Sequence, residues 1–230
     1  MNHELKKISE HMLSLGLGAL AHSNWHANYM SFENDSWPEL SVLQAAHAAE
    51  ILIKARIAEE HPLLIFEHLP RSTQVTDINL KLTHLVEKGK TIQYAELPER
   101  LWATTGIKLY NLEKYSSFGY LRNSIQHFAP PTDINFNEKT IEFIFEVIDP
   151  FINSCWDLYA IDYNEDYEPH VYFIEGLVRR GVKFLVSEEA TKELKHVHFE
   201  WPKGDVKYKS EMLKRFAEAG FTQQENPADS

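Results

Sequence analysis

The sequence predicts a mainly α-helical protein, and two observations support this fold class. Apolar residues recur at helical spacing over most of residues 1–160. Strand-like runs occur only in residues 161–230, after an acidic stretch at 162–169 that ends in Pro and is typical of an exposed connection. We therefore expect a helical domain over residues 1–160 and a small C-terminal α+β appendage of unknown role over residues 161–230.

Two long helices are expected first. Over residues 4–30, apolar side chains such as Leu5, Ile8 and Met12 recur every three or four positions. A second helix is expected over residues 38–60, where Ser36 and Glu39 fit a capping box. This second helix is apolar nearly all round, so we expect it to be the central, buried element.

The remaining elements follow in order. Helices are predicted at 76–88, 98–105, 112–128 and 138–159, and Pro150 should bend the last of these. Beyond the acidic connection we expect a helix at 171–180, extended strands at 182–186 and 196–201, and a final helix at 209–219. The polar residues 223–230 should form a loose tail.

Composition restricts the classes of function. A net charge of −11 counts against a broad electrostatic surface for nucleic acid, because non-specific binding depends on many Lys and Arg contacts to phosphates. The lone Cys155 cannot form an internal disulfide, which favours a reducing compartment. No apolar run has membrane-spanning length, and residues 1–7 lack the core of a signal peptide. We expect a cytoplasmic protein without a membrane partner.

The predicted helix 112–128 separates polar from apolar side chains. With Arg122 at zero on a helical wheel, Asn123 falls near 100° and His127 near 140°. The opposite side, between roughly 240° and 320°, carries the apolar residues Phe118, Leu121, Ile125 and Phe128. An Arg beside a His that faces away from the core can bind a phosphate and move a proton next to it.

The C-terminal end of this helix and the small residues on its polar side lead to two further expectations. Pro130 and Pro131 should stop the helix and leave His127 in its last turn. Ser116 and Gly119 have small side chains on the polar side, so that a second helix could approach it closely.

The central helix carries one polar stripe. His47, Glu50 and Lys54 stand at i, i+3 and i+7 and share a face of an otherwise apolar helix. In one interpretation Glu50 simply pairs with Lys54 on a small exposed strip. In the other, Glu50 and His47 face the helix 112–128 and orient Arg122 or His127. Spacing alone does not choose between them.

The string Arg122-Asn123-Ser124-Ile125-Gln126-His127 is similar to the Arg-Asn-x-x-x-His signature of the HEPN superfamily (higher eukaryotes and prokaryotes nucleotide-binding domains). The Ala-rich segment 43–55, with the acidic Glu50, also resembles an early helix of that family. The resemblance covers residues 1–160 and implies an antiparallel helical bundle that dimerises. It further implies a metal-independent endoribonuclease without cofactor, as found in toxin–antitoxin and anti-phage systems, with Arg122 and His127 catalytic and Asn123 supporting them.

Residue chemistry agrees with that activity. RNA carries its own nucleophile, the 2′-hydroxyl, so cleavage needs a general base, a general acid and a cation near the phosphate. His127 can act as acid or base near neutral pH, and Arg122 is a fixed cation. One copy supplies too few groups, whereas two copies across a dyad would supply a complete set. A cognate antitoxin would be a further protein partner.

Other interpretations stay open. The chain could be a non-catalytic HEPN-type module that binds a protein or nucleotide, because the superfamily includes such modules. A metal-dependent hydrolase is a second alternative, since His22 and His26 stand at i and i+4 on a predicted helix, although no acid or Cys nearby in the sequence completes a site. Finally, Arg122 could be a surface ion-pair partner and His127 a helix-capping residue.

Overall fold

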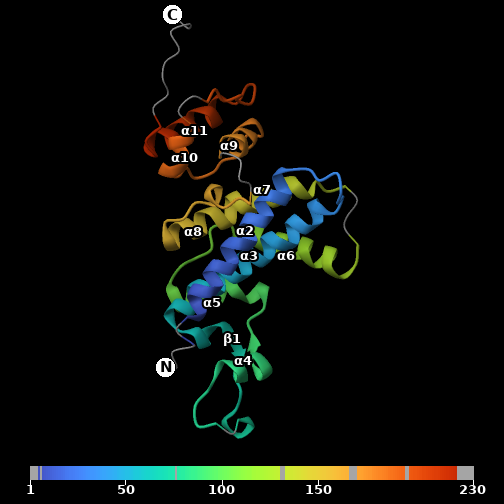
Figure 1. Cartoon of the computed structure of the whole chain (residues 1–230), viewed down its shortest axis with the longest axis vertical. Helices are drawn as coiled ribbons and strands as arrows, with labels where there is room; N and C mark the ends of the chain where they lie inside the picture. Colours follow the sequence, from blue (N-terminus) through green and yellow to red (C-terminus); the bar gives the residue numbers. More distant parts are fainter. Residues whose placement is uncertain are drawn as a thin grey trace, which may run out of the picture.

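The architecture comes from a computed structural model, which describes residues 5, 7–75, 77–129, 133–165, 170–194 and 197–221. The chain is mainly helical, as expected from the sequence. Helix α3 (Trp37–Glu60) lies at the centre of the molecule beside α2 (Ile8–Asn28), as Figure 1 shows. Half of the α3 side chains are buried, so the prediction that this helix is the central element is confirmed.

Helices α2 and α3 form an antiparallel hairpin. The ring of His26 bonds to Gln44 near the connection, while Gly16 meets Leu52 two to three turns further away. Gly16 allows the close approach of the two helices, because a Cβ there would lie 2.7 Å from Leu52 Cγ. The expected capping box at the start of α3 is wrong: Ser36 makes no side-chain capping bond, and its own N–H donates to Asn34 Oδ1.

A small lobe follows α3 and lies at the lower end of the molecule in Figure 1. It contains the 3₁₀ turns η1 (Pro62–Ile65) and η2 (Ser72–Gln74), helix α4 (Leu82–Lys88) and an antiparallel pair of strands, β1 (Phe66–His68) and β2 (Lys90–Thr91). The sequence did not predict the strands, and the helix expected at 76–88 begins only at Leu82. Strands this short carry too little alternating pattern to be recognised.

The chain then returns to the bundle through the turn η3 (Tyr94–Glu96), α5 (Leu97–Thr105) and α6 (Leu112–His127). Helices α5 and α6 both pack against α3. Helix α7 (Phe136–Phe143) runs antiparallel to α6, because Phe118 stacks on Phe143 while Lys114, one turn earlier, reaches Glu146. Helix α6 ends at His127, so this residue lies in the last turn as predicted, while Pro130 and Pro131 themselves lie outside the described residues.

The predicted helix 138–159 is present with one local distortion. Helix α7 continues through a π-helical turn, η4 (Ile144–Ile148), into α8 (Asp149–Trp156). In the π turn the N–H of Asp149 bonds to the carbonyl of Ile144, five residues earlier. Pro150 follows directly and has no N–H to donate, so the distortion falls where the ordinary helical ladder would be interrupted.

The C-terminal region is helical, and the expectation of an α+β appendage is wrong for the residues that the structure describes. It contains the turn η5 (Ala160–Asp162) and helices α9 (His170–Arg179), α10 (Glu188–Glu193) and α11 (Val206–Glu218). Residues 182–186 and 197–201 are extended but pair with no strand, and His196 lies outside the described residues. Helix α10 was not predicted.

Side chains take the place of a strand partner along 182–186. Three hydrogen bonds join this backbone to side chains: Tyr208 Oη donates to the Val182 carbonyl at 2.8 Å, Arg215 Nη1 donates to the Phe184 carbonyl at 2.7 Å, and the Leu185 N–H donates to Asp149 Oδ2 at 2.9 Å. Because these backbone groups have side-chain partners, the β-rich composition of the segment does not require a ladder.

The hydrophobic core is continuous from the bundle into the C-terminal helices. The ring of Phe145 in η4 contacts Phe173 of α9 and Phe184 of the extended segment. The buried Asp149 also joins the two parts through hydrogen bonds, because it accepts one from the Ala160 N–H at 2.8 Å in addition to the one from Leu185. None of the described helices combines the length and apolar character needed to cross a bilayer.

Candidate functional site

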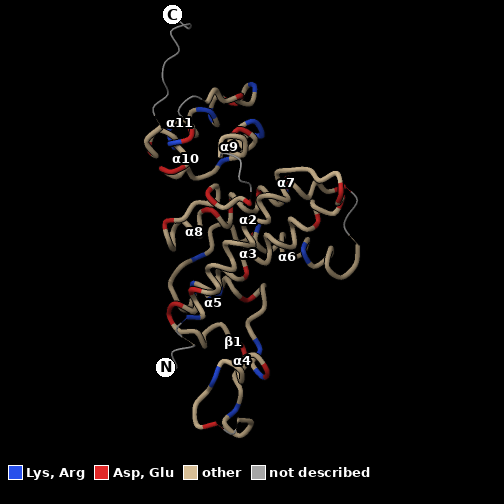
Figure 2. The backbone as a smooth tube through the Cα atoms, viewed as in Figure 1, with Lys and Arg blue, Asp and Glu red and all other residues tan. Residues whose placement is uncertain are grey.

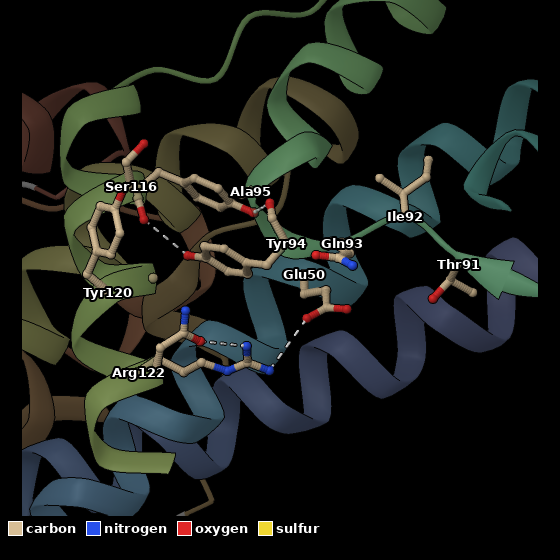
Figure 3. A pocket seen from close by; sticks show the side chains of 12 residues that line it. Glu50, Thr91, Ile92, Gln93, Tyr94, Ala95, Ser116, Tyr120 and Arg122 are labelled. Carbon is tan, nitrogen blue, oxygen red and sulfur yellow. Dashed lines mark hydrogen bonds and ion pairs between the residues drawn. The ribbon is translucent and has the colours of Figure 1, made fainter. Parts of the chain in front are cut away.

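A cavity of about 450 Å³ lies between α3, the segment from β2 to η3, and α6. Its walls combine charged, amide and aromatic side chains, as Figure 3 shows. The lining residues are Glu50, Thr91, Ile92, Gln93, Tyr94, Ala95, Tyr115, Ser116, Gly119, Tyr120, Arg122 and Asn123. Three of the six residues that the sequence singled out as site residues therefore border one cavity: Glu50, Arg122 and Asn123.

Arg122 extends from α6 into this cavity, and its side chain is 28% exposed. One guanidinium nitrogen donates to Asn123 Oδ1 at 3.2 Å, and another lies 4.0 Å from Glu50 Oε2. In Figure 3 the guanidinium and the Glu50 carboxylate point toward each other. At these distances most of the Arg122 N–H groups keep their capacity to bind an anion.

Glu50 and Lys54 form a buried ion pair. Lys54 Nζ lies 2.6 Å from Glu50 Oε1 and also donates to Thr91 Oγ1 at 3.4 Å. The Lys54 side chain is only 5% exposed, so the interpretation of a small exposed strip is wrong. Glu50 bonds Lys54 with one oxygen and faces Arg122 with the other, so the pair of the first interpretation is present together with the Glu50–Arg122 contact of the second.

His47 and His127 lie elsewhere. His47 is exposed and borders a groove with His22 and Gln44, away from the cavity. His127, the last residue of α6, is exposed, and its side chain makes no hydrogen bond or ion pair with any described residue. It follows Arg122 by five positions, about 140° around the helix and about 7.5 Å along its axis. A single chain thus keeps Arg122 and His127 apart.

Two tyrosines that the sequence did not indicate shape the cavity. The rings of Tyr94 and Tyr115 stack at 4.2 Å, and each hydroxyl donates to the backbone carbonyl of the other residue, at 3.3 Å and 2.8 Å. Burial raises the pKa of both phenols well above the ordinary value, so both rings stay neutral. No local pattern could reveal the pair, because Tyr94 lies in a turn 21 residues before Tyr115.

Tyr94 also corrects the expected role of Gly119. A Cβ at Gly119 would lie 2.7 Å from Tyr94 Cε1, so the glycine makes room for a ring of its own chain. The space that the sequence assigned to a second helix is therefore already filled. A second correction concerns Phe128, which was expected on the apolar face but is 92% exposed. It lies one residue beyond α6, where its backbone has left the helical conformation.

The two histidines of the metal alternative each have a separate polar partner. Their rings lie 6.2 Å apart, His22 pairs with Glu165 at 2.7 Å, and His26 bonds to Gln44 at 3.0 Å. Burial lowers the pKa of His26. Within the described ranges, no three His, Cys, Asp or Glu side chains are grouped as metal ligands.

Comparisons of the chain with family models, with curated proteins and with solved structures gave no match. The assignment of a function therefore depends on the residues and their geometry.

Proposed function

We propose that the protein is a HEPN-type, metal-independent endoribonuclease that acts as a homodimer, and that it serves as a toxin or anti-phage effector. The observation that supports the proposal best is the position of Arg122, held at the cavity by Asn123 and Glu50. A guanidinium with free donors at a cavity suits a phosphate group, because its planar fork matches phosphate oxygens.

In the proposed reaction the RNA 2′-hydroxyl attacks the adjacent phosphorus and the bond to the 5′-oxygen breaks. Arg122 binds the phosphate oxygens and stabilises the negative charge that develops on them. One His127 accepts the proton of the 2′-hydroxyl, and a second His127 donates a proton to the leaving 5′-oxygen. Both protons are accounted for, and the step needs no metal or cofactor.

This chemistry requires a second copy of the chain, since each copy has one His127 and keeps it away from its own Arg122. The C-terminal half of α6 offers a surface for that copy. Tyr120, Asn123 and His127 stand at i, i+3 and i+7 and are all exposed, and Phe128 extends the same end of the helix. An isologous contact here would cover two large aromatic rings per chain and bring the two motifs around one dyad.

The central test is RNA cleavage in the presence of EDTA. We expect the protein to cleave mixed RNA, and His127→Ala and Arg122→Ala to reduce the rate at least about a hundredfold, the usual size of an acid–base or charge-stabilising contribution. Because His127 is exposed, its replacement should change the free energy of unfolding by about 0.5 kcal/mol or less. His11→Ala, at another exposed histidine, is the control and should cleave normally.

A folded His127→Ala variant that still cleaves would contradict the catalytic assignment. Cleavage that EDTA abolishes would favour the metal-dependent alternative. A dimer that binds a protein or nucleotide without cleaving RNA would instead be the non-catalytic interaction module, a function that the acidic composition suits.

A second test concerns the dimer. Phe128→Asp should raise the dimer dissociation constant at least about tenfold, because it removes an apolar contact and places like charges near a dyad. The cleavage rate per chain should fall in parallel at protein concentrations where the native protein is dimeric. Phe32→Asp replaces a ring that is 98% exposed elsewhere and should change neither quantity. Light scattering and cleavage measured on the same samples decide this, and a fully active monomer would contradict the composite site.

A further inference from the structure

A second hollow borders the start of α6. It encloses about 380 Å³ and is lined by Pro98, Glu99, Trp102, Lys108, Leu109 and Leu112. Leu112 stands one helical turn before Ser116, which borders the Arg122 cavity, and Pro98 follows closely after Ala95 of the same cavity. The two hollows are therefore lined by neighbouring turns of α6 and by neighbouring residues of the segment 95–98, and Leu112 and Arg122 are about 15 Å apart along the helix axis.

Two exposed aromatic rings lie at or near the second hollow. The indole of Trp102 lines the second hollow and is 50% exposed, and Tyr110, in the connection to α6, is 76% exposed. Each ring presents an apolar face to solvent beside a concave surface. Faces of this kind stack on the bases of single-stranded nucleic acid, which every base allows.

The charges of this surface favour a single strand over a duplex. Lys108 has no ion-pair partner among the described residues, so each hollow has one cation available to a phosphate, Lys108 in the second and Arg122 in the first. Figure 2 shows Lys and Arg interspersed with Asp and Glu rather than collected on one element. A duplex carries dense charge on two backbones and hides its base faces, so it gains little here.

We propose that the hollow at Trp102 binds a base of single-stranded RNA, a few nucleotides along the strand from the phosphate that Arg122 holds. This inference rests on the proposed function for its choice of RNA, and it adds that the substrate is unpaired. Trp102 stacks on the base, Lys108 contacts the neighbouring phosphate, and the strand follows α6 from one hollow to the other.

The experiment measures binding of a fluorescent single-stranded 2′-deoxy oligonucleotide, which lacks the nucleophile and is not cleaved. Trp102→Ala should weaken binding at least about fivefold, and Trp102→Phe should retain most of the affinity, because a stacked base contributes through the ring face. Lys108→Ala should reduce the slope of affinity against salt by about 0.7, the value for one phosphate on a single strand. A double-stranded RNA of the same length should not compete.

Tyr172→Ala is the control, because this ring on α9 is 59% exposed and lies outside both hollows. Folded Trp102→Ala protein with native affinity, or equal binding of duplex, would overturn the inference and leave the hollow to another class of partner. Trp102-dependent binding by a protein that never cleaves RNA would contradict the proposed ribonuclease but not this strand-binding surface.

Discussion

Replacing Glu50 with Ala is expected to lower the free energy of unfolding by about 3 kcal/mol or more. The change removes the carboxylate 2.6 Å from Lys54, whose side chain is 5% exposed. An ammonium group left at this depth has only the Thr91 hydroxyl at 3.4 Å as a partner. Removing one member of a buried ion pair costs far more than the pair itself contributes, because the remaining charge is neither solvated nor compensated. Urea unfolding measures the loss.

Helix α3 provides a matched control for this change. Glu60 pairs with Arg56 through the same i, i+4 spacing, but the Glu60 side chain is 44% exposed, so Glu60→Ala should cost about 0.5 kcal/mol or less. The double change Glu50→Leu with Lys54→Met should recover much of the loss, since it removes both buried charges together. If Glu50→Ala costs no more than Glu60→Ala, Glu50 is solvated and cannot hold Arg122 in place.

Replacing Asp149 with Leu is expected to cost about 3 to 5 kcal/mol. Its two carboxyl oxygens accept the N–H groups of Ala160 at 2.8 Å and Leu185 at 2.9 Å. Leucine has a similar size but no acceptor, so two buried N–H groups lose their partners at about 1–3 kcal/mol each. The extended segment 182–186 also loses its bond to α8. Asp35→Leu, at an exposed acidic residue, should change stability by about 0.5 kcal/mol or less, and an equal effect of the two changes would contradict this role.

The same carboxyl should make stability depend on pH. Burial raises the pKa of Asp149 from 3.8 to about 7, against the opposing effect of its two backbone hydrogen bonds. Between these values the folded protein binds more protons than the unfolded chain, so the contribution of Asp149 is fully present below about pH 4 and declines as the pH rises toward 7. The difference in unfolding free energy between native protein and Asp149→Asn should therefore be larger at pH 5 than at pH 8. A difference independent of pH would contradict the raised pKa.

The sequence by itself determined the helices of the bundle and the polar face of α6. Periodic apolar residues identified α3 as the buried centre, and the i, i+4 spacing of Glu50 and Lys54 made their pairing one of two interpretations that the sequence left open. These features are local, since a helix repeats its faces every 3.6 residues and its side-chain neighbours follow from that repeat.

Only the tertiary structure decided which of these groups meet. The approach of Glu50 to Arg122, the insertion of Tyr94 over Gly119 and the bond from Leu185 to Asp149 all join residues distant in the chain. Their partners depend on how helices pack, and no periodicity encodes that. For the same reason residues 182–186 were predicted as a strand. Their composition favours an extended backbone, but it does not decide what the backbone N–H and C=O groups bond to. Packing alone places the side chains of Asp149, Tyr208 and Arg215 there in place of another strand.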